Sequence, residues 1–79
     1  MNFVDLQFEN KHYVYEVDVP GQAAHHVFDN GVSVHVWRSE RSEGYAEGKY
    51  IVEKYVGASL TEVRNLTPSE INDYLQGLV

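Results

Sequence analysis

The Asn30-Gly31 pair constrains the fold of this chain more than any other feature. It lies inside the stretch HVFDNGVSVHVW, where valines alternate with polar and aromatic residues. An Asn-Gly pair between two such runs is the strongest short-range signal of a β-hairpin with a two-residue type I′ turn. In the register that this turn sets, His26 faces His35 on the neighbouring strand.

The same register sorts residues 25–37 onto two faces, because successive residues of a strand point to opposite sides. The valine-rich face is the predicted core side, and its members are His25, Val27, Asp29, Val32, Val34 and Val36. The opposite, exposed face carries His26, Phe28, Ser33, His35 and Trp37.

A second hairpin is predicted near the N-terminus, with Asn10-Lys11 as its two-residue loop. This loop places a set of apolar side chains on one face, namely Val4, Leu6, Phe8, Tyr13, Tyr15 and Val17. On the other face, Asp5 lies opposite Glu16. Pro20-Gly21 follows the second strand and is typical of the central residues of a type II turn.

The C-terminal half predicts a loop, one or two strands and a helix. Residues 38–48 have no apolar period and form the loop, and residues 49–56 are rich in β-branched and aromatic residues and form a strand. Residues 59–66 allow two interpretations: Ser59 and Glu62 fit a helix capping box, whereas a strand would place Val63 beside Val52. We favour the strand.

The last segment predicts a helix. Thr67 is its N-cap, Pro68 occupies the first helical position and Glu70 completes a capping box. The apolar stripe of this helix consists of Ile71, Tyr74, Leu75 and Leu78.

Together these elements predict an α+β fold: an antiparallel β-meander of five or six strands with one C-terminal α-helix packed on the sheet. The chain has 79 residues, of which 43% are hydrophobic, so we expect residues 1–79 to form a single ordered domain.

Composition narrows the class of protein. The chain has no cysteine, which suits a reducing compartment, and it shows neither a signal peptide nor a membrane-spanning run. We therefore expect a soluble cytoplasmic protein. Its net charge is −6, and the acid excess is densest in residues 1–37. A negative field repels nucleic acid and attracts basic surfaces, so direct nucleic-acid binding is disfavoured.

Catalytic and metal-binding patterns are weak. The expected His26–His35 pair offers two nitrogen ligands, but a catalytic zinc site usually has three protein ligands, and no carboxylate is expected beside the pair. The serines lie in no nucleophile-elbow pattern, and there is no glycine-rich phosphate loop. We therefore expect a protein that is not an enzyme and uses no metal or other cofactor.

The function predicted from these features is binding of a protein partner that has a basic surface, such as a nucleic-acid-handling complex. In size, acidity and lack of cysteine, the chain resembles the small inhibitors that bacteriophages make, such as anti-CRISPR proteins and polymerase inhibitors.

The alternative is a single-stranded nucleic-acid binder that stacks bases on Phe28 and Trp37. A third option is a small metal-dependent enzyme, and a homodimer is also possible. The residues predicted to bind the partner are Asp5, Glu16, Asp18, Phe28, Trp37, Arg38, Glu40, Arg41 and Glu43.

Overall fold

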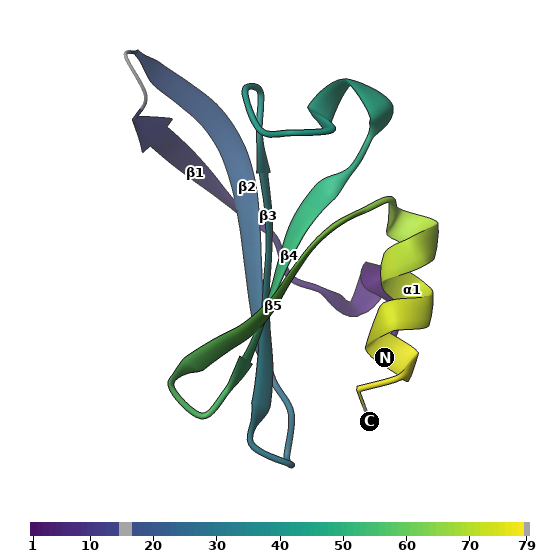
Figure 1. Cartoon of the computed structure of the whole chain (residues 1–79). Coiled ribbons are helices and arrows are strands. Elements are labelled where there is room, and N and C mark those ends of the chain that lie inside the picture. Colours follow the sequence, from purple (N-terminus) through teal and green to yellow (C-terminus); the bar gives the residue numbers. More distant parts are fainter. Residues whose placement is uncertain (15–16, 79) are drawn as a thin grey trace.

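The computed structural model describes residues 1–14 and 17–78 and confirms the predicted fold class. A five-stranded antiparallel sheet has the strand order β1-β2-β3-β4-β5, and one α-helix follows it (Figure 1). The strands are β1 (Glu9–Val14), β2 (Asp18–Val27), β3 (Val32–Ser39), β4 (Tyr50–Val56) and β5 (Ser59–Leu66). The helices are the 3-10 helices η1 (Phe3–Asp5) and η2 (Tyr45–Glu47) and the α-helix α1 (Pro68–Gln76).

The molecule has two layers, because α1 and η1 lie on one side of the sheet (Figure 1). We call the side of the sheet that they cover the helix-side face. The core lies between the layers, where Val34, Val36 and Val52 of the sheet and Ile71 and Leu75 of α1 are fully buried. This burial supplies most of the stability of a domain of this size.

The β2–β3 hairpin turns where the sequence predicted, but its loop type is different. Phe28 N–H donates to the carbonyl of Val32 at 2.8 Å, so the loop has three residues, with Gly31 at a φ of 82°. Asn30 does not have a positive φ, and a type I′ turn is therefore excluded. A type I turn followed by a left-handed glycine is the usual three-residue hairpin loop.

The extra loop residue shifts the predicted register by one. His25 now pairs with His35, and His26 pairs with Val34. The predicted faces of β2 were consequently inverted: Phe28 is buried in the core, whereas Val27 is 62% exposed on the opposite side. The faces of β3 were assigned correctly.

The predicted N-terminal hairpin is wrong. Asn10 and Lys11 lie inside β1, and Pro20 and Gly21 lie inside β2, so neither pair forms a turn. The expected pairs of Tyr15 and Glu16 lie outside the described residues. Residues before β1 do not extend the sheet: Phe3 and Phe8 instead pack on Tyr50, with ring centroids 5.2 and 5.4 Å from its ring.

Residues 59–66 form a strand, as favoured, although Val63 pairs with Glu53 and not with Val52. The register shift between Lys54 and Tyr55 accounts for this difference, because the register of Val56 with Ser59 would otherwise continue to Val52 with Val63. The predicted capping box of α1 is confirmed, because the Thr67 side chain accepts from Glu70 N–H and the Glu70 carboxylate accepts from Thr67 N–H.

Candidate functional site

The side of the sheet opposite α1 is the candidate site, and we call it the open face. Strand alternation and cross-strand pairing define its members. Its apolar members are Tyr13, Val19, Ala23, Val27, Trp37, Ile51, Tyr55, Leu60 and Val63, and its polar members are Glu9, Lys11, His25, Ser33, His35, Ser39, Glu53 and Asn65. The exposed fractions of Val27, Val63 and Leu60 are 62%, 56% and 49%, so this face carries large apolar side chains in contact with solvent.

Trp37 forms the aromatic part of the open face together with Tyr13. Their rings are stacked, with centroids 5.1 Å apart and planes inclined by 28°. Gly21 makes room for this pair, because a Cβ atom there would lie 2.7 Å from the Tyr13 ring. The sequence correctly placed Trp37 on the face opposite the core, but it did not pair it with Tyr13.

A polar group lies at the centre of the open face. His35 Nδ1 lies 3.1 Å from Glu53 Oε1, and the His25 and His35 ring centroids are 6.4 Å apart. The histidine pair on this face is therefore His25–His35 and not the predicted His26–His35. The expectation that no carboxylate lies beside the pair is also wrong, because Glu53 does.

These three side chains do not form a metal centre. Among residues 1–14 and 17–78, no group of three or more His, Asp or Glu side chains is arranged to hold a metal ion. The His35–Glu53 contact is better described as a cross-strand pair that satisfies polar groups within an apolar surface.

The residues predicted to bind the partner do not form one surface. Trp37 lies on the open face, whereas Arg38 points to the helix-side face, where Tyr45 and Tyr50 contact its guanidinium. Phe28 is 7% exposed, so its predicted exposure was wrong, and it belongs to the core.

The predicted acidic residues are also dispersed. Asp5 is exposed in η1, beside α1. Asp18 begins β2 and forms an exposed ion pair with His12 at 3.2 Å. Glu40, Arg41 and Glu43 are exposed in the loop after β3, and Glu16 lies outside the described residues. η2 in this loop packs toward Arg38 on the helix-side face (Figure 1). The carbonyl of Glu43 in the same loop accepts from Asn65, which strand pairing places on the face of Ile51 and Trp37, so the loop does not lie on one face alone.

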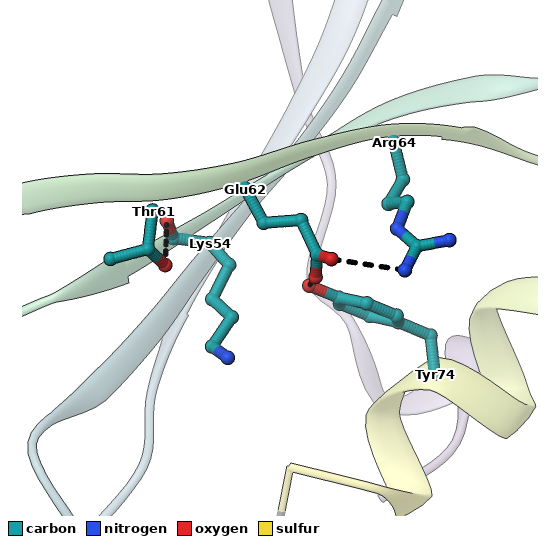
Figure 2. A network of polar contacts seen from close by, with 5 residues as sticks. All are labelled: Lys54, Thr61, Glu62, Arg64 and Tyr74. Atoms are coloured by element: carbon teal, nitrogen blue, oxygen red, sulfur yellow. Dashed lines mark hydrogen bonds and ion pairs between the residues drawn. The ribbon is translucent and has the colours of Figure 1, made fainter.

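The helix-side face has its own polar network, which Figure 2 shows between β5 and α1. The Glu62 carboxylate accepts hydrogen bonds from the Tyr74 hydroxyl and from Arg64, the latter at 3.0 Å. Both bonds lower the pKa of Glu62, and the bond from Tyr74 has a larger effect than the bond from Arg64. Burial and the bond to Glu62 raise the pKa of Tyr74. The network holds α1 against the edge strand β5, so we assign it a role in stabilising the fold.

Sequence reasoning missed the contribution of β4 and β5 to the open face, namely Ile51, Tyr55, Leu60 and Val63. A signal was present, because in residues 51–56 apolar residues occur at both odd and even positions. A strand with one solvent face normally alternates apolar and polar residues, so this pattern indicates a strand whose two faces are both apolar.

No protein-family model, curated protein or solved structure matches this chain. None of the helices in the described ranges is long and apolar enough to cross a membrane. Chemistry of the surface is therefore the basis for any functional proposal.

Proposed function

We propose that this chain is a non-enzymatic interaction protein that binds a protein partner through its open face. One observation carries the proposal: large apolar side chains, among them Val27 and Val63, are exposed together on the face that α1 leaves uncovered. A sheet of this kind normally buries both faces if both are apolar, and exposed apolar patches mark interaction sites. Trp37 supplies the large aromatic side chain that is typical of binding hot spots.

The open face has a suitable size. The molecule measures 38 × 26 × 20 Å along its principal axes, so its broad face matches the roughly 800 Å² that each partner contributes to a standard interface. The stacked Trp37–Tyr13 pair and the strand backbone make this face rigid, which lowers the entropic cost of binding.

The partner that we propose has a basic surface around an apolar patch. The chain carries 12 acidic and 6 basic residues, so its field attracts a basic protein and raises the association rate. A second copy of the chain would bring another charge of −6 and would be repelled at long range. The finer proposal is an inhibitor of the phage type, acting in the cytoplasm on a nucleic-acid-handling protein.

Single-stranded nucleic acid is the second candidate ligand, because Trp37 and Tyr13 provide aromatic rings on a sheet. Two features weigh against it. The two rings already stack on each other, and Phe28, which was expected to complete the platform, is buried. Lys11 is the one Lys or Arg on the open face among the described residues, so a phosphate backbone finds little positive charge there.

A matched pair of variants tests the proposal. Val63→Glu puts a charge on the open face, and Val56→Glu puts the same charge on the other side of the sheet at a similarly exposed position. We expect wild type and Val56→Glu to capture the same basic protein from host extract. We expect Val63→Glu to lose it and to bind the purified partner at least about tenfold more weakly, an ordinary hot-spot effect.

Three outcomes would contradict the proposal. The purified partner could bind Val63→Glu and wild type equally. Light scattering could show a dimer that Val63→Glu dissociates, which would make the occupant a second copy. A labelled oligonucleotide could bind wild type and fail to bind Trp37→Ala, which would favour the nucleic-acid alternative.

A further inference from the structure

A row of three polar side chains crosses the helix-side face beyond the end of α1. Asn10 of β1 pairs with Gln22 of β2, and Gln22 pairs with Arg38 of β3, so the three lie side by side. Together they line a hollow of about 220 Å³. The rest of its lining consists of Pro20, Gly21, Glu40 and Tyr45.

Arg38 is the charged member of this row, and it is half-buried. Its guanidinium carbon lies 4.8 Å from the centroid of the Tyr50 ring and 5.1 Å from that of Tyr45. Ring faces attract a guanidinium and limit its rotation, but they accept none of its planar N–H bonds. Within residues 1–14 and 17–78, no carboxylate forms an ion pair with Arg38, although the chain has twice as many acidic as basic residues.

The two amides beside Arg38 are similarly unengaged. Within the described ranges, the side chains of Asn10 and Gln22 make no hydrogen bond to another protein group. Three adjacent side chains that carry N–H donors therefore line one hollow. Several donors gathered at one hollow can recognise an oxyanion, and a guanidinium with restricted rotation is suited to bidentate contact.

The wall of the hollow is held in place independently of any ligand. Tyr45 begins η2, and Gly48 N–H donates to its carbonyl at 3.0 Å. Asn65 of β5 donates to the carbonyl of Glu43 at 2.8 Å, and Glu40 N–H donates to the carbonyl of Pro20. The loop is therefore anchored to both β5 and β2, and the hollow is formed before a ligand arrives.

We infer that this hollow binds a single carboxylate group, with Arg38 as its bidentate donor and Asn10 and Gln22 as secondary donors. A carboxylate matches the guanidinium fork with its two coplanar oxygens. A phosphate dianion fits less well, because Glu40 lines the same hollow and the net charge is −6. The hollow has room for a small acid or for the carboxylate end of a peptide, since a water molecule takes up roughly 30 Å³.

A titration followed by nuclear magnetic resonance tests this site. Sodium propionate is added to ¹⁵N-labelled protein at constant ionic strength, with sodium chloride as the reference salt. We expect saturable shifts in the side-chain N–H signals of Asn10, Gln22 and Arg38. Linear, non-saturating shifts equal to those with chloride would overturn the inference.

A pair of arginine variants identifies the donor. Arg38→Met keeps the length and apolar stem, and we expect it to weaken propionate binding by roughly tenfold or more, as for the loss of a charge-assisted pair. Arg64→Met removes an equal charge from β5 and should leave binding unchanged. Equal weakening in both variants would mean that only the overall charge matters and would refute the site. If Arg38→Met fails to fold, the titration of the wild-type protein with propionate still tests whether the hollow binds a carboxylate.

Two further ligands separate the possible sources of the carboxylate. A short peptide with a free C-terminus is compared with the same peptide ending in an amide, and both are compared with propionate and inorganic phosphate. Tighter binding of the peptide acid than of propionate indicates a protein terminus, whereas equal binding indicates a small acid. Phosphate that binds more tightly than both would contradict the carboxylate assignment. The site lies on the face opposite Trp37, so these results do not depend on the proposed function.

Discussion

Gly31 shows how one residue determines which side chains become core. Its φ of 82° completes a three-residue loop, and this loop pairs Val27 with Ser33. A two-residue loop would move every side chain of β2 to the other face relative to β3. The backbone conformation of Gly31 therefore sets the register that pairs His25 with His35 on the open face. The same register places Phe28 in the core.

Replacing Gly31 by Val should destabilise the fold by about 1–2 kcal/mol, the cost of a left-handed conformation for a residue with a Cβ atom. No atom lies within 4 Å of a Cβ built at this position, so the cost is conformational and not a clash. Urea denaturation measures the loss. Ser33→Val, in the neighbouring strand, is the control for adding a β-branched residue, and equal effects of both changes would argue against the loop.

Glu62 should make stability depend on pH in the acid range. Hydrogen bonds from Tyr74 and then from Arg64 lower its pKa below the ordinary value of 4.5. The contribution of ionised Glu62 to folding stability is therefore fully present above pH 4.5. It is lost as the pH falls through the lowered pKa of Glu62 in the folded state. We expect Glu62→Gln to be less stable than wild type at neutral pH, with a difference that shrinks on acidification. A pH-independent difference in denaturation midpoint would contradict this assignment.

At the scale of elements, α1 is held by its cap and by its buried stripe. Thr67→Ala removes the acceptor for Glu70 N–H and should cost about 1 kcal/mol. Ser69→Ala changes an exposed position of the same turn and should be nearly neutral. Thermal unfolding followed by circular dichroism compares the two, and the cap has no role if both melt at the same temperature.

The elements that the sequence predicted correctly are those with local signals. Thr67, Pro68 and Glu70 specify the start of α1 within four residues, and Asn30-Gly31 specifies the place of a hairpin. The N-terminal prediction failed because Asn10-Lys11 is a weak turn signal, and distant packing decided the outcome. Phe3 packs on Tyr50 and does not extend a strand, and no local sequence pattern records that contact.

The candidate site was less predictable than the fold, and for a physical reason. A one-residue error in a hairpin loop inverts a whole strand, so Trp37 was placed correctly while Phe28 was not. The Asn10–Gln22–Arg38 row depends on the β1–β2 and β2–β3 registers at once, and the sequence predicted neither of them correctly.

At the scale of the whole molecule, the two layers leave one apolar face without cover. Trp37→Ala should keep the fold, because Trp37 lies outside the buried core, and should weaken partner binding by about 2 kcal/mol or more. Calorimetric titration measures the binding loss, and circular dichroism verifies the fold. A Trp37→Ala protein that unfolds would instead make the Trp37–Tyr13 pair structural.

The strand order also has a kinetic consequence. Every strand pairs with its neighbour in the chain, so each hairpin can close without waiting for distant segments. The contacts between η1 and α1 are different, because Phe3 N–H donates to Asn72, 69 residues away. Loop-closure entropy opposes such contacts until the sheet exists. The N-terminal segment and α1 should therefore dock after the folding transition state, and mutations there should accelerate unfolding while leaving the folding rate nearly unchanged.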